Sequence, residues 1–201
     1  MQVVAMETSF RSEGTFTQSD FRRWLERRPP SDIHHYELIR GHIVMSPPAG
    51  AWHGCVGSGL NRLLGLHVKE RRLGRLFDAS AGFELPSGDT LQPDLAFVSR
   101  ARWEAGPRPS GNEFMRIVPS LVVETLSPST ERRDRTEKLD IHVQNGVDEY
   151  WLVDLHRRAI TIFQRAGDVF GAPTTVTASR IPSLVLPDLE ARVEDVFADI
   201  D

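Results

Sequence analysis

The sequence predicts a mixed β-sheet flanked by helices, in the α/β or α+β class. Two pairs of apolar, β-branched runs separated by short turns, at residues 36–46 and 149–163, are each typical of an antiparallel hairpin. A strand-like run at 120–126 precedes a helical pattern at 131–145, and the next strand-like run follows directly. This order predicts a strand–helix–strand crossover, and a crossover combined with hairpins favours a mixed sheet covered by helices.

The chain is predicted to form a single domain preceded by a flexible N-terminal tail. At 201 residues it is short enough for a single hydrophobic core. Residues 1–14 are polar and show no periodicity, so we expect a flexible N-terminal tail there. No repeat, low-complexity segment or linker divides the remainder, which predicts a single domain over residues 15–201.

The N-terminal half of this domain is expected to contain two helices and several strands. Thr17 has the character of a helix cap and Pro29 ends the apolar stripe that follows, which predicts a short amphipathic helix between them. Apolar residues at helical spacing predict a long helix at residues 51–71. The expected strands of this half lie at residues 36–40, 42–46, 76–77, 82–85 and 95–98.

The C-terminal half is expected to alternate strands and helices after a long loop. Prolines and glycine between residues 99 and 118 favour a loop there. The polar run from Ser127 to Thr130 is expected to cap the helix at 131–145, and Gly146 to end it. The remaining elements are expected as a strand at 120–126, a hairpin of 149–153 with 159–163, and a short helix at 190–197.

Composition excludes several classes of protein. Cys55 is the only cysteine, so neither an intramolecular disulfide nor a CxxC zinc site is possible. No apolar stretch is long enough for a membrane span, and we expect a soluble, cytoplasmic protein without membrane contact. The net charge of −4 lacks the basic excess of a typical nucleic-acid-binding domain. Clustered arginines, such as Arg132, Arg133 and Arg135, are more readily interpreted as solvated helix faces than as phosphate contacts.

Two acidic residues at strand positions are the main candidates for a functional site. Glu124 lies inside the apolar run at 121–126, where an ionised carboxylate is costly to bury without a partner or a metal. Asp94 follows Pro93 just before another expected strand. If the two strands are neighbours, the carboxylates would make a pair suited to Mg²⁺. The alternatives are a Glu124 at a wet end of its strand and an Asp94 in an exposed turn.

Lys138 is the third candidate, on the helix after the strand that carries Glu124. Lysine occurs only at positions 69 and 138, so arginine is the default basic residue of this chain. A compact ammonium approaches a nucleophilic water more easily than a broad guanidinium does. The alternative interpretation is an ordinary solvated helix residue.

These residues, with their surroundings, resemble the PD-(D/E)XK nuclease superfamily. Pro93 and Asp94 match its PD, and Glu124 its second acidic position. The chain resembles more specifically the bacterial Uma-two family of restriction-endonuclease-like proteins, from about Phe16 to its C-terminus. The segments that carry this likeness are 36–39, 45–48, 92–95, 122–124, 126–130, 132–135 and 146–151. A strict E-x-K motif would place lysine at 126, where Leu126 stands, and the Uma-two pattern maps the lysine onto Lys138 instead.

The resemblance implies a restriction-endonuclease-like fold and a site for Mg²⁺ or Mn²⁺. By this likeness, Asp94 and Glu124 would bind the metal, with the Thr125 carbonyl as a possible further ligand. Lys138 would position or deprotonate the attacking water and offset negative charge in the transition state. The substrate would be DNA, and a homodimer is expected because symmetric dimers are common among soluble proteins.

Three more residues are candidates for supporting roles. Glu37 maps onto the family's early acidic position and would add a catalytic carboxylate, unless it is a surface residue at a strand end. His53, near the start of the long helix, is a possible accessory residue facing the same cleft. Asp134 lies four residues before Lys138 and is expected to pair with it along the helix.

Two other functions remain open at this level. The nuclease fold could serve without catalysis, as a nucleic-acid-binding or dimerisation module. A phosphatase or nucleotide hydrolase is less favoured, because no GxxxxGK phosphate loop is present. The sequence does not determine base preference, DNA versus RNA, the number of metals, oligomeric state or physiological role.

Overall fold

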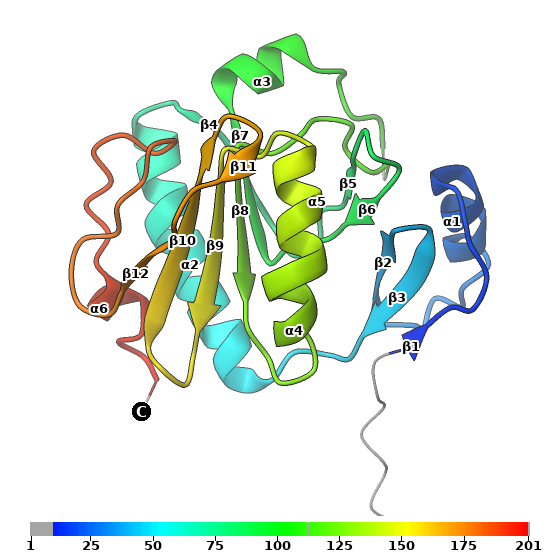
Figure 1. Ribbon diagram of the computed structural model, residues 1–201, viewed down its shortest axis with the longest axis horizontal. Coiled ribbons are helices and arrows are strands. Elements are labelled where there is room, and N and C mark those ends of the chain that lie inside the picture. The colour runs from blue at the N-terminus through cyan, green and yellow to red at the C-terminus, as the bar shows by residue number, and fades with distance from the viewer. Residues whose placement is uncertain (1–9, 112, 201) are drawn as a thin grey trace, which may run out of the picture.

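A computed structural model describes residues 10–111 and 113–200, which form two β-sheets with helices packed against them (Figure 1). The larger sheet has the strand order β11-β10-β9-β8-β7-β4, with β12 also pairing with β10. Its strands are β4 (Gly74–Asp78), β7 (Leu95–Ser99), β8 (Leu121–Thr125), β9 (Glu149–Asp154), β10 (Ala159–Ala166), β11 (Val169–Phe170) and β12 (Thr174–Val176). The predicted mixed sheet flanked by helices is therefore confirmed.

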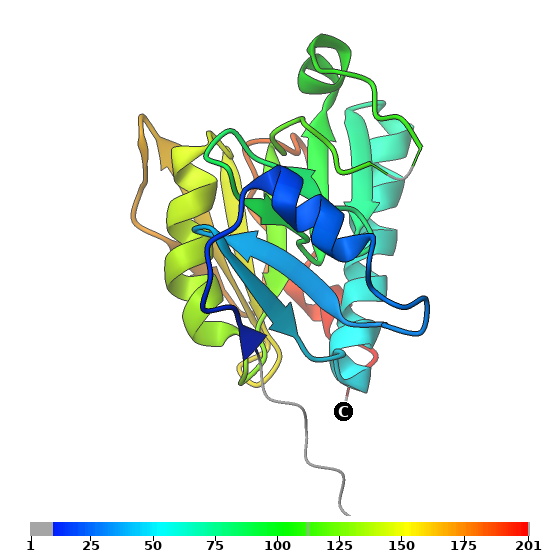
Figure 2. The same cartoon turned by 90° about the vertical axis from the view of Figure 1, so that its right-hand side faces the viewer.

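The smaller sheet has the order β1-β3-β2-β6-β5 and carries the predicted N-terminal hairpin. Its strands are β1 (Phe10–Arg11), β2 (His35–Ile39), β3 (His42–Ser46), β5 (Phe83–Glu84) and β6 (Thr90–Leu91). Arg40 and Gly41 form the hairpin turn with φ values of 51° and 78°, and positive φ at both positions suits a tight two-residue turn. Figure 2 shows this hairpin in front of the larger sheet, between its two helical layers.

Six helices and one π-helical turn complete the described chain. They are α1 (Gln18–Leu25), α2 (Ala51–Glu70), α3 (Arg100–Ala105), α4 (Glu131–Arg133), η1 (Asp134–Lys138), α5 (Leu139–Gln144) and α6 (Val193–Val196). The long helix α2 covers one face of the larger sheet, and the continuous segment α4–η1–α5 covers the other (Figure 1). No helix within the described residues is long and apolar enough to cross a membrane.

Strand β8 lies between the two helical layers, and its side chains point alternately toward one layer and the other. Leu121 and Val123 pack in the cluster that contains the α2 residues Leu60 and Leu64. Val122 packs in a different cluster on the α5 side. This alternation follows from the period of two along a strand, and it turns both faces of β8 inward. A buried central strand of this kind leaves no wet position for a charged side chain.

The predicted connections around β8 are also confirmed. Strands β7 and β8 are antiparallel, whereas β8 and β9 are parallel and joined through α4–η1–α5. Strands β9 and β10 form the second predicted hairpin. A parallel pair needs a long crossover connection, and the helical segment supplies it.

The structure differs from the sequence-based expectations in the N-terminal tail. Residues 1–9 of the expected tail lie outside the described residues. Phe10–Arg11, also assigned to the tail, instead form β1 and pair with Val44 and Met45 of β3. The Arg11 guanidinium contacts the Glu137 carboxylate at 2.9 Å, a contact between segments far apart in sequence that no local pattern predicts.

The expected loop at 99–118 is wrong at its start, where α3 forms. The Ser99 hydroxyl accepts a hydrogen bond from the Arg102 backbone N–H, which caps the helix. The Arg102 guanidinium then donates to the carbonyls of Val118 and Pro119 and to the Asp148 carboxylate. Prolines later in the segment obscured this short helix in the sequence.

The predicted helix at 131–145 is present but is not a uniform α-helix. Its N-cap residue, Thr130, makes no side-chain capping bond, contrary to expectation. Its hydroxyl instead lies 3.0 Å from the Ser127 hydroxyl. The five residues from Asp134 to Lys138 adopt a π-helical turn, a rare conformation that is often found at functional sites.

Candidate active site

The two acidic candidates lie on neighbouring strands. Leu95 is paired with Val123 in the antiparallel β7–β8 ladder. Asp94 and Glu124 are the next residues beyond this pair, so they lie opposite each other at the same edge of the sheet. The Asp94 carboxylate is also bonded to the residue after Glu124, because the Thr125 backbone N–H donates to Asp94 Oδ2 at 2.7 Å. The expectation that the two strands would be neighbours is therefore confirmed.

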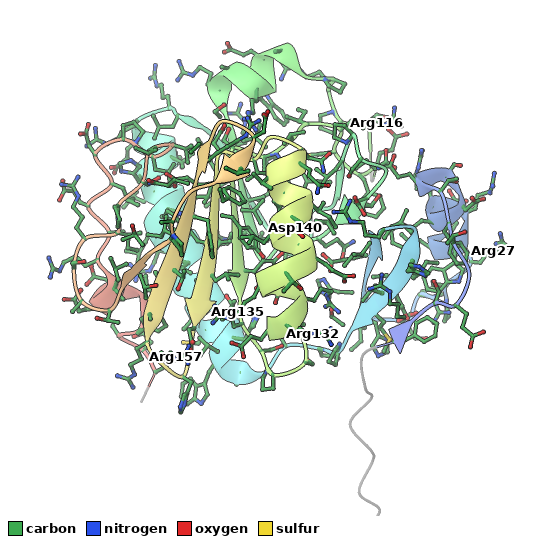
Figure 3. The ribbon with its side chains drawn as sticks, viewed as in Figure 1. Arg27, Arg116, Arg132, Arg135, Asp140 and Arg157 are labelled. Carbon is green, nitrogen blue, oxygen red and sulfur yellow. The ribbon has the colours of Figure 1, made fainter. Side chains whose placement is uncertain are left out.

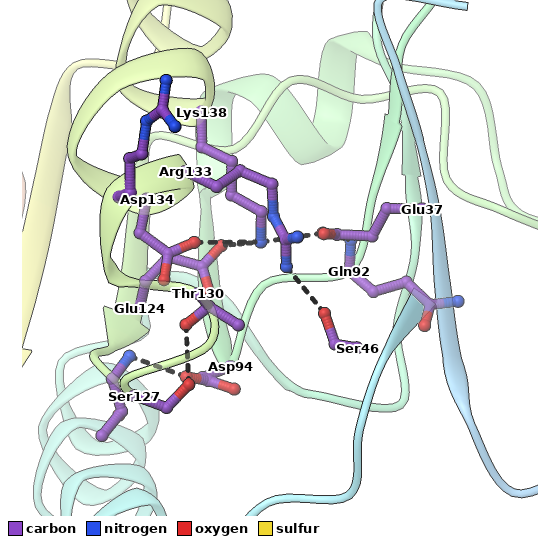
Figure 4. Close-up of polar contacts among 12 residues, drawn as sticks. Glu37, Ser46, Gln92, Asp94, Glu124, Ser127, Thr130, Arg133, Asp134 and Lys138 are labelled. Atoms are coloured by element: carbon purple, nitrogen blue, oxygen red, sulfur yellow. Dashed lines mark hydrogen bonds and ion pairs between the residues drawn. The ribbon is translucent and has the colours of Figure 1, made fainter. Parts of the chain in front are cut away.

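Lys138 lies at the centre of a buried cluster of acids. Its Nζ is 2.9 Å from Glu37 Oε1, 2.9 Å from Glu124 Oε1 and 3.7 Å from Asp134 Oδ1 (Figure 4). All four side chains are at least 94% buried, so these ion pairs are shielded from solvent. The alternatives of a solvated Lys138 and a wet Glu124 are excluded by this burial.

The π-helical turn positions the basic member of this cluster. Asp134 and Lys138 are the first and last residues of η1 and are both buried against the sheet. The Tyr150 hydroxyl of β9 donates to the Asp134 carbonyl at 3.0 Å, which ties the turn to the sheet. Glu37 comes from β2 of the smaller sheet, and its Oε1 also accepts from the Gln92 N–H at 2.9 Å. Elements of both sheets and one helix thus converge on the ammonium.

The charges of the cluster shift one another's pKa values. Burial alone would lower the pKa of Lys138, but the charges of Glu124, Glu37 and Asp134 outweigh it and hold this pKa above its ordinary value. Burial raises the pKa of Glu124 well above its usual range, because the attraction of Lys138 does not offset burial and the neighbouring acids. Burial likewise raises the pKa of Asp134. The cluster therefore holds more carboxylates than a single ammonium can balance.

Asp94 forms a second, less buried pair with His53. His53 Nε2 lies 3.1 Å from Asp94 Oδ2, and the two side chains are 18% and 22% exposed. Burial lowers the pKa of His53, but the hydrogen bond and charge of Asp94 reverse the effect and raise it overall. Burial acts to raise the pKa of Asp94, but the hydrogen bond and charge of His53, the Thr125 N–H and the charge of Lys138 lower it overall. His53 thus faces the candidate site, as expected for an accessory residue.

The oxygen donors present fit a small hard cation. Asp94 Oδ2 and Glu124 Oε1 are engaged by protein donors, while the second oxygen of each carboxylate has no hydrogen bond to a described residue. Across residues 10–111 and 113–200, no group of three or more His, Cys, Asp or Glu side chains is arranged to hold a metal ion. Two carboxylates beside surplus negative charge suit Mg²⁺, which commonly takes one or two carboxylates and completes its octahedron with water and phosphate oxygens.

The residues proposed for the site from the sequence fall into two adjoining groups. Glu37, Glu124, Asp134 and Lys138 make the buried cluster, and the remaining candidates, His53, Asp94 and Thr125, lie together beside it. Their catalytic and metal-binding roles stay predictions.

Two residues near these groups had not been singled out as site candidates. Arg133 Nη2 donates to Ser46 Oγ at 2.7 Å, which links the helix to the end of β3 (Figure 4). Both residues lie in segments that carry the family resemblance, and that position was the only signal of their importance.

Comparisons with known proteins bear on the fold and on the family of this chain. A curated relative, the uncharacterized protein sll1609 of Synechocystis sp., is 26% identical over 134 residues, which cover 66% of this chain and 73% of the relative. A crystal structure described as "a putative nuclease belonging to DUF820", from Anabaena variabilis, superposes with a TM-score of 0.75 at 19% identity. That match covers 91% of this chain and 98% of the other, and it shows that the fold is shared.

A family model described as "Putative restriction endonuclease" matches residues 19–194. The match includes every candidate residue from Glu37 to Lys138 and every strand of the two sheets except β1. The protein therefore belongs to the Uma2 family.

Proposed function

We propose that this protein is a Mg²⁺- or Mn²⁺-dependent endonuclease that hydrolyses phosphodiester bonds in DNA, with a homodimer in the cytoplasm as its working form. The observation that carries the proposal is the Lys138 ammonium, held 2.9 Å from both Glu37 and Glu124 beside the Asp94 strand end. A buried lysine among acidic residues is weak evidence for a purely stabilising role, because desolvation of the charged groups offsets much of their mutual attraction. Membership of the Uma2 family supports a nuclease over other metal-dependent hydrolases.

Three of the acidic residues have roles that follow from their partners. Asp94 and Glu124 would hold the cation through their free oxygens, with the Thr125 carbonyl as the further ligand. Glu37 holds the ammonium on its other side and is itself fixed by the Gln92 N–H. When bound, the cation would polarise the phosphate and offset the negative charge of the transition state.

The protonation state of Lys138 decides between its two expected roles. The surrounding carboxylates raise its pKa, which favours the protonated ammonium before a cation binds. A lysine that stays protonated cannot accept a proton from water. We therefore assign Lys138 to positioning the attacking water and to electrostatic stabilisation, rather than to deprotonation.

The decisive experiment is cleavage of supercoiled plasmid DNA with and without Mg²⁺ or Mn²⁺. We expect the parent protein to nick or cut the plasmid only when a metal is added. The Asp94→Asn and Glu124→Gln variants are expected to cut at no more than about a hundredth of that rate, a loss typical of removing a group that stabilises the transition state. The exposed Asp140→Asn variant is the matched control and should cut like the parent.

Equal cleavage by the parent and both site variants would contradict the proposal. Calorimetry with Mn²⁺ tests the metal site directly, and binding that is lost in Asp94→Asn is expected. A parent protein that neither binds Mn²⁺ nor cuts DNA would favour the catalytically silent nucleic-acid-binding or dimerisation module. Sedimentation equilibrium measures the expected homodimer independently of activity.

A further inference from the structure

Arg133 differs from the other cations of the site in lacking an anionic partner. Lys138 contacts three carboxylates and His53 contacts Asp94. Within the described part of the chain, the Arg133 guanidinium makes no ion pair with a carboxylate, and its one side-chain hydrogen bond is donated to the neutral Ser46 hydroxyl. Its Nε is buried and has no hydrogen-bond partner there. A half-buried guanidinium thus carries a positive charge and spare donors that the protein itself does not satisfy.

The position of Arg133 relates this unsatisfied charge to the candidate active site. It immediately precedes Asp134 at the junction of α4 and η1, and the Arg133 charge acts on the Asp134 carboxyl. Figure 4 shows the side chain extending from the helix toward Ser46. The neighbouring residues Arg132 and Arg135 lie on the outer surface of the same helix (Figure 3). Arg135 there contacts Glu131 and Asp154, so its charge is already compensated.

Retaining an unpaired guanidinium here has a cost that an anion would remove. A buried donor left without a partner destabilises the folded protein, and more so when the group is charged. Carboxylates are close by, yet they are directed at Lys138 and His53 instead. The planar guanidinium fork matches the oxygens of a phosphate group, to which it can donate two hydrogen bonds.

We propose that Arg133 binds a phosphate group of the nucleic-acid strand at the active site, with Ser46 holding the guanidinium in position. This inference rests on the proposed nuclease function and names the contact through which the otherwise acidic site accepts an anionic substrate. The positive charge of Lys138 is already offset by its ion pairs with Glu37 and Glu124. Arg133 supplies a positive charge beside the acid cluster that remains available to a phosphate group.

The test measures DNA binding separately from cleavage. Every protein carries Asp94→Asn so that no strand is cut, and a short fluorescein-labelled DNA duplex is titrated by fluorescence anisotropy in Mg²⁺ at several salt concentrations. Adding Arg133→Ala is expected to weaken binding about tenfold, as for loss of one charge-assisted contact. It should also reduce the salt slope by about 0.9, as for loss of one phosphate contact. Arg133→Lys should keep the slope and recover part of the affinity.

Two further variants separate a phosphate contact from other effects. Arg27→Ala is the matched control, because Arg27 is an exposed arginine without a carboxylate partner in the described chain and projects outward near α1 (Figure 3). It removes the same charge and should leave both affinity and slope unchanged. Ser46→Ala should weaken binding less than Arg133→Ala does, since it frees the guanidinium without removing it. Thermal unfolding of each variant shows whether the fold is retained.

Equal binding by the Arg133→Ala and Arg27→Ala proteins would overturn the inference, and so would absence of DNA binding by the Asp94→Asn protein itself. Neither result bears on whether the parent cuts plasmid DNA, which the cleavage experiment decides. Conversely, a parent that fails to cut, combined with binding that depends on Arg133, would leave the phosphate contact in place and remove only the nuclease activity.

Discussion

Replacing Lys138 with methionine is expected to destabilise the fold by about 3–5 kcal/mol at pH 7, the usual cost of removing one partner from a buried ion pair. Methionine keeps much of the volume of the lysine stem but removes the ammonium. Glu37, Glu124 and Asp134 would then lie buried together with no cation among them. Equilibrium urea unfolding of the parent and the variant measures the difference.

The pH dependence of this destabilisation distinguishes a charge effect from a packing effect. Burial already raises the pKa of Glu124 and of Asp134, and without the attraction of the ammonium these two carboxyls should hold their protons to still higher pH. In the unfolded chain the pKa values of Asp and Glu are about 4. A folded-state pKa raised in this way gives stability below the unfolded pKa that is lost as the pH rises. The variant should therefore approach the parent near pH 4 and fall furthest behind it at neutral pH.

The only other lysine of the chain provides the matched control. Lys69 lies on α2 and is exposed, so Lys69→Met changes the net charge equally without touching the acid cluster. We expect its free energy of unfolding to stay within about 0.5 kcal/mol of the parent, as for most surface substitutions. A Lys138→Met protein with the same stability as Lys69→Met at pH 7 would show that the cluster contributes no electrostatic stabilisation.

Part of this site could be predicted from local pattern alone. The apolar alternation around Glu124 predicts a buried strand, and burial is what makes its charge informative. The position of Asp94 just before another apolar run predicts a strand end. Their adjacency follows once β7 and β8 pair, since both residues lie at the same end of the ladder. Hydrophobic periodicity therefore carries most of the information about these two carboxylates.

The remainder depends on geometry that a sequence pattern does not encode. In the π-helical turn from Asp134 to Lys138 the backbone hydrogen bonds span five residues instead of the four of an α-helix, which shifts the helical register. An ideal α-helix would therefore misplace the Lys138 ammonium. The Arg133 contact with Ser46 joins residues 87 positions apart and depends on how the two sheets meet. The short helix α3 is held by Arg102 contacts to distant backbone carbonyls. Such long-range contacts are decided by tertiary packing.

Acidification to pH 5 is expected to cost the parent about 2 kcal/mol of stability through His142 alone, since each pKa unit corresponds to about 1.4 kcal/mol. His142 is 1% exposed, and burial, with a further contribution from the Lys138 charge, lowers its pKa from 6.5 to about 3. The unfolded chain thus binds a proton at a pH where the folded chain does not. The stabilising contribution is complete above pH 6.5 and is lost as the pH falls toward 3.

His142→Phe should remove this acid sensitivity while keeping the ring in place. The His142 and Tyr150 rings lie 5.1 Å apart, and phenylalanine preserves that contact. Both imidazole nitrogens are buried without a partner among the described residues, so replacing them with carbon should leave the protein equally stable or about 1 kcal/mol more stable at neutral pH. Urea unfolding at pH 7 and pH 5 measures both effects, with the exposed His156→Gln as control. If His142→Phe loses as much stability as the parent between these pH values, the acid sensitivity arises elsewhere, and the carboxylates around Lys138 become the groups to titrate next.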